Sequence, residues 1–191
     1  MKVLKSPWFK CIACLLAIAV ISGALLSALS NLWFVSSETR TARAIEKIYG
    51  EEKEYSVILD IDKGEKAIEY DGVGTVNKVY AVGTDMLFQT TGYKGYKNGT
   101  VTLWVKVIKN GEKYEIEKVL LETFEKQTLM GKLTDDFYGK FKLEDVTESY
   151  KNERYFSTEA NPVSGATYSA TAAANAVNCV IRYLGEQGGN A

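Results

Sequence analysis

An uncharged stretch near the N-terminus constrains the fold of this chain more than any other feature. The segment CIACLLAIAVISGALLSAL extends from Cys11 to Leu29 and contains no charged residue. A helix of roughly 20 apolar residues is long enough to cross the hydrocarbon core of a bilayer. Aromatic residues flank the stretch on both sides, as is typical of the two membrane interfaces, namely Trp8, Phe9, Trp33 and Phe34. Residues 1–35 are therefore expected to form a short stub and a transmembrane helix.

Basic residues before the apolar stretch predict its orientation. Lys2, Lys5 and Lys10 precede it, and positively charged flanks tend to stay in the cytoplasm. We therefore expect a cytoplasmic N-terminus and an extracytoplasmic C-terminal domain at the cell membrane. A cleaved signal peptide is the alternative, because Ala28-Leu29-Ser30 has the small-x-small pattern of a cleavage site. Signal-peptide cores usually span about 7–15 residues, so the length of this stretch favours a retained single-pass anchor.

The composition excludes several classes of function. The 191 residues carry 23 basic and 24 acidic side chains, which gives no electrostatic basis for binding nucleic acid. Histidine is absent, so imidazole metal sites and Ser-His or Cys-His nucleophile pairs are excluded. Cys11 and Cys14 form a C-x-x-C inside the apolar stretch, where we interpret them as small apolar residues. Cys179 is alone in the remainder, so we expect no disulfide framework. We also predict no metal site and no catalytic residue.

The residues after Ser36 are numerous enough for one globular domain with its own core. The segment SSETRTARAIEKIYG predicts a helix that a serine caps and that Gly50 ends. Short strands are expected at YSVIL, GTVNKVYAVG and DMLFQTTGY. Residues 36–79 are thus interpreted as a membrane-proximal helix followed by the first strands.

A hairpin is the clearest local prediction. In TVTLWVKVIK, Val101, Leu103, Val105 and Val107 alternate with polar or aromatic residues, which is the period of a strand. The dipeptide Asn110-Gly111 follows, and it is preferred at the centre of type I′ hairpin turns. The segment EKYEIEKVLLE is then expected to form the antiparallel partner strand.

Helical spacing recurs in the C-terminal part. Leu133, Phe137 and Phe141 lie four residues apart and predict a short helix. A final helix is expected to end at Gly185, Gly188 and Gly189, with one apolar face formed by Ala170, Ala173, Ala174, Val177, Ile181 and Leu184. The predicted fold class is α+β, with an N-terminal transmembrane helix, a mostly antiparallel sheet and a C-terminal helix.

The candidate site is Ser164-Gly165-Ala166-Thr167, at the start of the final helix. A helix N-terminus has unpaired amides and the positive end of the helix dipole, and it therefore binds phosphate well. Glycine allows unusual backbone angles and close approach of a ligand, and Thr167 offers an alcohol in the first turn. Simple capping of the helix by Ser or Thr is the alternative.

The wider pattern resembles the extracytoplasmic FMN-binding domain shared by the G subunit of the Rnf complex and the C subunit of the sodium-translocating NADH:quinone oxidoreductase. The S-G-A-T motif matches that family residue for residue. The resemblance implies an FMN-binding domain over residues 80–191 and FMN attached covalently to Thr167 through a phosphoester, which a flavin transferase installs. Ser164, Gly165 and Ala166 would belong to the same site.

Two further segments are similar to the family. Gly92, Tyr93 and Gly95 match a glycine-tyrosine-x-glycine segment before a strand. A second family motif, a glutamate-threonine pair followed by a leucine-glycine turn, implies flavin contacts by Glu122, Thr123 and Leu129, with Gly131 in the turn. Of the aromatic candidates for stacking on the flavin, which are Tyr93, Tyr96, Trp104 and Tyr168, we favour Tyr168 because it adjoins Thr167.

The chain also departs from the family pattern. Asn161 stands where members usually have an aspartate, which bears on recognition by the transferase. Phe124-Glu125 replaces the usual proline-glycine after the glutamate-threonine pair, and a solvated loop is the alternative interpretation of that region.

The resemblance implies a membrane-anchored electron carrier rather than an independent catalyst. Its partners would be other membrane redox subunits of an Rnf-type ion-translocating complex. A stand-alone exported flavin carrier or reductase is one alternative. A flavin-free anchored interaction module, in which S-G-A-T only caps a helix, is the other.

Overall fold

The computed structural model describes residues 7–33, 36–160 and 162–188. It divides into two compact units, residues 1–41 and 42–191. Asn161, Lys2, Lys5, Phe34 and Gly189 lie outside the described residues.

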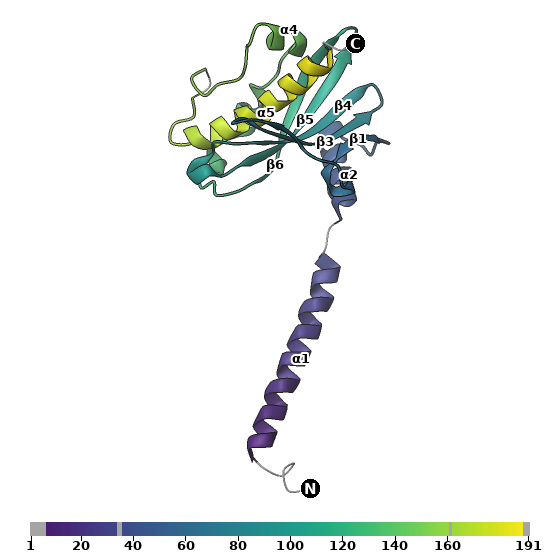
Figure 1. Cartoon of the computed structure of the whole chain (residues 1–191), viewed down its shortest axis with the longest axis vertical. Helices are drawn as coiled ribbons and strands as arrows, with labels where there is room; N and C mark the ends of the chain where they lie inside the picture. Colours follow the sequence, from purple (N-terminus) through teal and green to yellow (C-terminus); the bar gives the residue numbers. More distant parts are fainter. Residues whose placement is uncertain (1–6, 34–35, 161, 189–191) are drawn as a thin grey trace. The chain divides into compact units, whose positions relative to one another are not determined.

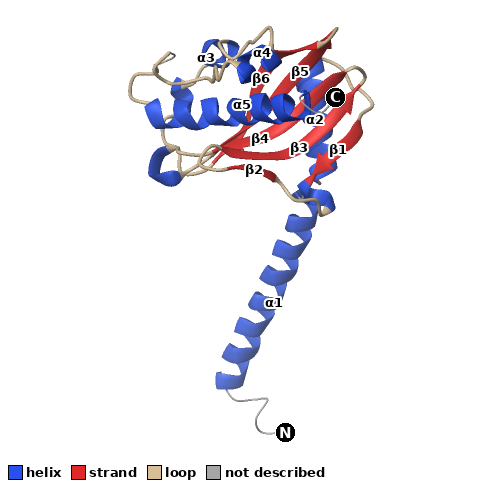
Figure 2. Cartoon of the chain, turned by 45° about the horizontal axis from the view of Figure 1, so that its top comes forward, coloured by secondary structure: helices blue, strands red, loops and turns tan. Residues whose placement is uncertain are grey.

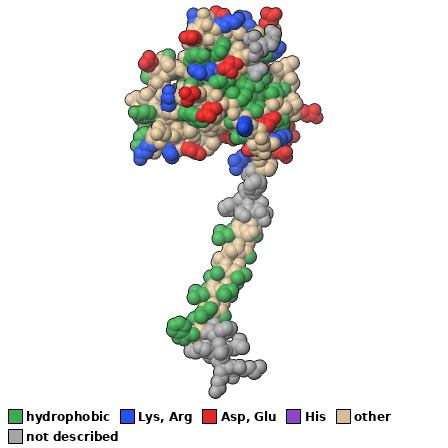
Figure 3. All heavy atoms as spheres, viewed as in Figure 1, with side chains coloured by type: hydrophobic (Ala, Val, Ile, Leu, Met, Phe, Trp, Pro, Cys, Tyr) green, Lys and Arg blue, Asp and Glu red, His purple; other side chains and the backbone are tan. Residues whose placement is uncertain are grey.

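Helix α1, Pro7–Trp33, contains the apolar stretch expected from the sequence. The 19 residues from Cys11 to Leu29 are long and apolar enough to cross a membrane, and none of this stretch is buried. Figure 3 shows hydrophobic side chains along this helix. The prediction of one N-terminal helix of membrane-spanning length is confirmed.

Helix α2, Ser37–Tyr49, has the ends that the sequence predicts. The Ser36 hydroxyl accepts a hydrogen bond of 3.2 Å from the Thr39 amide, which is the geometry of a serine cap. Gly50 ends the helix with a φ of 80°, and its amide donates to the Glu46 carbonyl at 2.8 Å. Positive φ at this position favours glycine, because the left-handed conformation is unfavourable for residues that have a Cβ.

The domain is built on one six-stranded sheet in which every pairing is antiparallel. Its order is β1-β3-β4-β5-β6, and β2 pairs with β3. The strands are β1 Ser56–Asp60, β2 Ile68–Tyr70, β3 Gly74–Val82, β4 Asp85–Gly92, β5 Val101–Asn110 and β6 Lys113–Phe124. Because β3 contains residues 79 and 80, the sheet is continuous across the boundary that we placed there.

The hairpin of β5 and β6 is confirmed, but its turn lies one residue later than expected. Asn110 pairs with Lys113 and belongs to the strand, so Gly111 and Glu112 form the turn. Of these two, only Gly111 has positive φ, at 65°. The turn thus places glycine at its first central position, and the side chain of Asn110 instead donates to the Glu115 carboxylate at 3.0 Å.

Two helices cover opposite faces of the sheet (Figures 1 and 2). On one face, α5, Thr167–Gly188, packs its small residues against β3, β4 and β5 in the larger core. On the other face, Ile45 and Ile48 of α2 pack against Tyr80, Leu87 and Trp104. Alternation along the strands separates the two cores, so that Val105 belongs to the first and Trp104 to the second.

The segments between β6 and α5 differ from the prediction. The short helix is α3, Asp135–Gly139, so of the three expected residues only Phe137 is helical. Leu133 precedes α3 and Phe141 follows it, yet all three side chains are buried in the larger core. Two further elements, η4 Met130–Lys132 and α4 Val146–Lys151, were not expected, and neither was β2.

Gly185 does not end the C-terminal helix, since α5 continues to Gly188. The ring of Tyr150 packs so closely on Gly185 that a Cβ there would be 2.1 Å from it. This glycine therefore serves the contact between α4 and α5, and the expectation that it ends the helix was wrong.

Candidate functional site

The S-G-A-T segment forms a tight turn into α5. Gly165 has a φ of 76°, and the Ala166 amide donates to the Val163 carbonyl at 3.0 Å. The Ala166 carbonyl accepts the first helical hydrogen bond, from the Ala170 amide at 2.9 Å. Ala166 therefore occupies the N-cap position, and Thr167 is the first residue inside the helix.

This geometry leaves the first amides of α5 without a side-chain cap. Alanine has no oxygen to accept their hydrogen bonds, although serine or threonine is usual at an N-cap. In the described part of the chain, the hydroxyls of Ser164 and Thr167 make no hydrogen bond to these amides. Thr167 is exposed, so its hydroxyl is accessible to a reagent.

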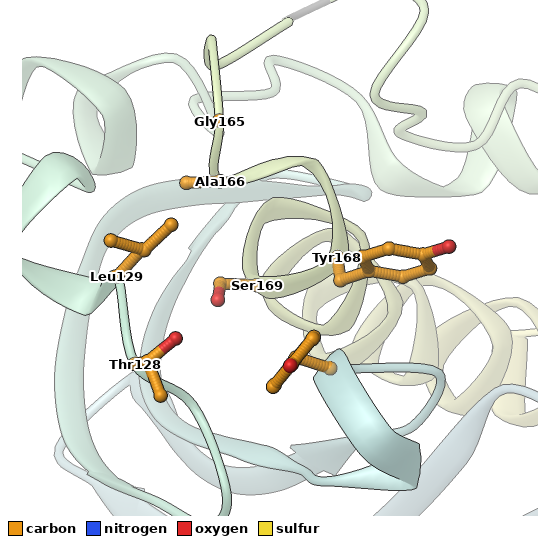
Figure 4. A pocket seen from close by; sticks show the side chains of 7 residues that line it. Thr128, Leu129, Gly165, Ala166, Tyr168 and Ser169 are labelled. Carbon is orange, nitrogen blue, oxygen red and sulfur yellow. The ribbon is translucent and has the colours of Figure 1, made fainter.

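A pocket of about 340 Å³ opens beside this turn. It is lined by Tyr96, Thr128, Leu129, Gly165, Ala166, Tyr168 and Ser169. Figure 4 shows Leu129 and Thr128 on one side and the first turn of α5, with Ser169 and Tyr168, on the other. The predicted site residues Gly165, Ala166, Tyr168 and Leu129 are thus brought together around one hollow. Thr167 lies between Ala166 and Tyr168 in the chain, but neither it nor Ser164 is among the lining residues.

The three segments around the pocket meet at a buried glutamine. Gln127 Oε1 accepts a hydrogen bond of 3.0 Å from the Tyr96 amide and one of 2.9 Å from the Ser169 hydroxyl. Its Nε2 donates to the Glu125 carbonyl at 3.0 Å. Gln127 therefore fixes the loop after β4, the loop after β6 and the first turn of α5 relative to one another.

The loop after β4 is held by α5 as well. Asn175 Nδ2 donates to the Tyr93 carbonyl at 3.0 Å. At Gly92 the helix approaches so closely that a Cβ would be 1.9 Å from the Ala172 carbonyl oxygen. The Gly92-Tyr93 segment therefore has a steric reason for its glycine, independent of any ligand.

A lysine lies against the S-G-A-T turn. The Lys132 ammonium donates to the Ser164 carbonyl at 3.0 Å. A Cβ on Gly165 would be 2.7 Å from the same Nζ atom, which the flexible lysine could relieve by moving, so the φ of 76° is the main reason for glycine here. The helix N-terminus and Lys132 together place positive electrostatic potential at the turn that leads into Thr167.

Two tyrosines stand at the mouth of the pocket. The rings of Tyr96 and Tyr168 are 6.4 Å apart between centroids and inclined by 57°. Tyr168 is 64% exposed and Tyr96 is 39% exposed, so both present aromatic surface to solvent. The Lys97 ammonium lies 5.4 Å from the Tyr96 ring centroid.

The backbone of the two loops is unusual. Four of the five described non-glycine residues with positive φ belong to them, namely Lys94, Lys97, Asn98 and Lys126. Such conformations are unfavourable for residues with a Cβ and persist where the surrounding structure imposes them. They gather at functional sites more often than elsewhere.

Other predicted residues lie away from the pocket. Glu122 accepts a hydrogen bond of 2.6 Å from Gln89, which shares the α2-facing side of the sheet with Leu87 and Trp104. Thr123 pairs with Thr102, whose hydroxyl contacts that of Thr91 on the same side. Trp104 is buried in the smaller core. The structure therefore does not bring Glu122, Thr123 or Trp104 to the pocket.

Sequence reasoning missed Gln127, Thr128, Lys132 and Ser169. A buried glutamine gives no periodic signal, and its importance depends on contacts between distant segments. Ser169 could have been identified from the sequence, because it lies three residues after Ala166 and therefore on the same side of the predicted helix.

A second hollow of about 430 Å³ lies where β6 approaches α3. Lys118 and Lys47 are among the residues that line it. The Lys118 ammonium donates to the carbonyls of Lys47 and Ile48 at 3.3 and 3.2 Å, at the end of α2. This lysine stabilises a helix C-terminus, so its position has a structural explanation.

The first pocket has exposed aromatic rings in its lining, and the turn next to it adds the exposed alcohol of Thr167, the first amides of α5 and the Lys132 ammonium. Within the described residues, no group of histidine, cysteine or carboxylate side chains is arranged to hold a metal ion. Such an arrangement suits an anionic, aromatic ligand. Comparisons with family models, with curated proteins and with solved structures find no match.

Proposed function

We propose that this protein is a membrane-anchored flavoprotein that carries electrons through FMN esterified to Thr167. The observation that supports this most directly is the N-terminus of α5, where Ala166 takes the N-cap position and Thr167 presents its hydroxyl to solvent. If the motif served only as a cap, a side-chain oxygen would be expected at that position. The resemblance of S-G-A-T to the covalent attachment motif supplies the identity of the ligand.

The residues around Thr167 fit a phosphoester. The amides at the start of α5 and the Lys132 ammonium are suited to an anionic phosphate group. The pocket and the rings of Tyr96 and Tyr168 offer apolar surface next to it. Bound FMN would supply one-electron chemistry, and the protein would supply orientation and electrostatics.

Attachment requires an activated donor. In the proposed reaction, Thr167 Oγ1 forms a bond to the flavin-side phosphorus of flavin adenine dinucleotide. The diphosphate bond breaks, adenosine monophosphate leaves, and the hydroxyl proton passes to the flavin transferase or to solvent. The exposure of Thr167 makes this atom accessible to such an enzyme.

Co-expression with a flavin transferase tests the proposal. Denatured protein should remain fluorescent on a gel, and the peptide that contains Thr167 should gain the mass of an FMN ester. Thr167→Ala should abolish both signals, whereas Ser164→Ala should retain flavin. An unmodified Thr167 under these conditions would refute the proposal.

We further propose that α1 is retained as a single-pass anchor with the domain on the extracytoplasmic side. Protease added to cells stripped of their wall or outer membrane should then degrade the domain and spare the N-terminus. A protected domain would reverse the orientation. Recovery of soluble exported protein that begins near Asn31 would instead establish cleavage.

The proposed partners are other membrane redox subunits of an Rnf-type ion-translocating complex. Among the described residues that line the pocket, none is a carboxylate or an amine that could form an acid–base pair for an organic substrate, which favours an electron carrier over an independent catalyst. In membranes from cells that lack the native protein, the full-length chain should restore electron flow and Thr167→Ala should not. Equal restoration by both would refute a role for the attached flavin.

A further inference from the structure

The segments that surround the pocket are basic, although the chain as a whole is not. Residues 93–100, 125–132 and 162–168 contain four lysines and one glutamate, which is a net charge of +3, whereas the whole chain carries 23 basic and 24 acidic residues. The Lys94 ammonium is directed toward the turn at Gly72, 3.7 Å from the position that a Cβ there would take. The other three, Lys97, Lys126 and Lys132, are termed the basic rim.

The charges of the basic rim are not neutralised by carboxylates. The ion pairs of the described residues are formed by Lys53, Lys78, Lys106 and Lys113, and none involves a rim lysine. All three rim lysines are exposed. Positive charge that is both exposed and unpaired attracts an anionic partner and accelerates its association.

The backbone of the loops that carry Lys97 and Lys126 is held in place by the surrounding structure. Lys97 and Lys126 have φ values of 50° and 55°, which are unfavourable for residues with a Cβ. Their loops are joined by paired hydrogen bonds between Thr100 and Glu125, of 3.2 and 3.0 Å, and by Gln127. A fixed arrangement of charges suits a partner whose own charges are fixed.

Apolar side chains occupy the centre that the rim surrounds. Tyr96, Leu129 and Tyr168 line the pocket and are 39%, 42% and 64% exposed. An aromatic and apolar centre bordered by charged residues is the usual composition of a protein–protein interface. Tyrosines in such a centre often contribute much of the binding energy.

Building on the proposed function, we infer that the basic rim docks an acidic protein, with carboxylates of that partner around Lys97 and Lys126 and an apolar contact at Tyr168, while Lys132 stays with the phosphate. The partner would exchange electrons at the pocket that it covers. An anionic lipid surface has the same charge, but its headgroups are mobile and match neither the fixed loops nor the hollow between them. Docking itself requires only side chains of this chain and not the flavin.

Carbodiimide cross-linking in native membranes tests the inference, because this reagent joins an amine to a carboxylate only where the two are in contact. Mass spectrometry should find Lys97 and Lys126 linked to aspartate or glutamate of a second protein. The exposed lysines Lys140 and Lys142 lie outside the rim and serve as internal controls. Cross-links should decrease at high salt, since exposed charges are screened.

Charge reversal provides the matched comparison. Lys97→Glu with Lys126→Glu should lower the cross-linked fraction and slow association about 10- to 100-fold at low ionic strength. Lys140→Glu with Lys142→Glu should leave both unchanged. Thermal unfolding of both double variants will show whether each remains folded, and Lys97→Gln with Lys126→Gln gives a milder test if the reversed pair does not.

The outcomes separate docking from the proposed function. Cross-links that persist in Thr167→Ala, or in wild-type protein that carries no flavin, support docking even if the flavin proposal fails. Flavin on Thr167 without rim cross-links, or with equal cross-links at Lys140 and Lys142, overturns docking and leaves the flavin proposal intact. Protection of Lys97 and Lys126 from an amine-reactive label only in nanodiscs of anionic lipid, and not in membranes containing partners, would assign the rim to lipid and overturn the inference.

Discussion

Ser169 Oγ donates a hydrogen bond of 2.9 Å to Gln127 Oε1, and both side chains are buried, with Ser169 in the lining of the pocket. Gln127 Oε1 also accepts a hydrogen bond from the Tyr96 amide. One glutamine therefore links two residues that are 31 and 42 positions away from it in the sequence. The S-G-A-T turn is therefore positioned by contacts that reach across the sequence. The pocket depends on these contacts as much as on the motif itself.

Gln127→Leu should destabilise the domain by about 1–3 kcal/mol, because the Tyr96 amide and the Ser169 hydroxyl lose their buried acceptor. Ser169→Ala is the matched control, since it removes one donor and leaves the Tyr96 contact in place. Urea unfolding followed by tryptophan fluorescence measures both. If Gln127→Leu proves no more destabilising than Ser169→Ala, the glutamine does not organise the loops.

The buried thiol gives a second prediction. Burial raises the pKa of Cys179 to about 12, while the nearby Arg182 opposes this rise. The thiolate is the form that reacts, so iodoacetamide at pH 8 should not modify Cys179 in the folded protein. Cys11→Ser with Cys14→Ser removes the competing thiols. Urea should expose Cys179 to rapid labelling, and equally rapid labelling without urea would contradict its burial.

Much of the fold was predictable because it depends on local patterns. Four such patterns each span only a few residues and indicate the element to which they belong. They are the alternation around Val105, the glycine of the hairpin turn, the Ser36 cap and the small residues on one face of α5. The position of the hairpin turn was displaced by one residue, since Asn110 tolerates both the turn and the strand. The short strand β2 and helix α4 lack a sustained period, so tertiary pairing decides them.

The site was predictable only where a contiguous motif defines it. The turn at Thr167 follows from the S-G-A-T motif, and Leu129 and Tyr168 line the pocket together with Gly165 and Ala166 of that motif. Glu122 was expected at the pocket because of its place in the sequence motif. A bulge in β6 opposite Thr102 and Leu103, together with the alternation along β6, instead directs its side chain to Gln89 on the face of the sheet that α2 covers. Gln127 and Lys132 become visible only when the distant segments are brought together.

The stability of the domain should depend on pH through Asp145. The Glu148 amide donates to its carboxylate at 2.9 Å, and this bond, assisted by Lys113, holds the pKa of Asp145 below its ordinary value near 4. A lowered pKa in the folded state means that the carboxylate stabilises the fold above pH 4 and loses this effect as the pH falls through the folded pKa.

Asp145→Ala should therefore cost about 1 kcal/mol of stability at pH 7, the usual value of a lost N-cap, and much less at pH 2. Asp145→Asn retains a capping oxygen without the charge and should lie between the two at pH 7. Thermal unfolding at both pH values measures the difference. A deficit of the same size at pH 2 and pH 7 would show that ionisation of Asp145 plays no part.

Gly92→Ala should destabilise the domain by at least about 1–3 kcal/mol, the usual range for overpacking. Its Cβ would lie 1.9 Å from the Ala172 oxygen and 2.4 Å from the Ala176 nitrogen, so α5 would have to move away from β4. Gly131→Ala is the control, because a Cβ there meets nothing within 4 Å. Chemical unfolding of the two variants compares them, and similar midpoints would contradict the close packing of α5 on β4.

Lys132 gives the most direct test of the electrostatics beside Thr167. Lys132→Met keeps an unbranched side chain of similar length but removes the ammonium, and with it the 3.0 Å hydrogen bond to the Ser164 carbonyl. A hydrogen bond with a charged group is worth about 1.5–3 kcal/mol net, and solvent screening lowers this at the exposed Lys132. Flavin attachment to Thr167 should therefore slow by roughly 3- to 10-fold. Lys132→Arg retains the charge and should stay near the wild-type rate. Lys126→Met removes a nearby exposed ammonium that does not contact the turn, and it should have little effect on attachment.

The measurement is the time course of in-gel flavin fluorescence at a limiting concentration of transferase, with the final extent of labelling recorded for each variant. A Lys132→Met variant that is labelled as fast as wild type, or no more slowly than Lys126→Met, would show that this lysine only supports the loop and does not assist a phosphate at Thr167.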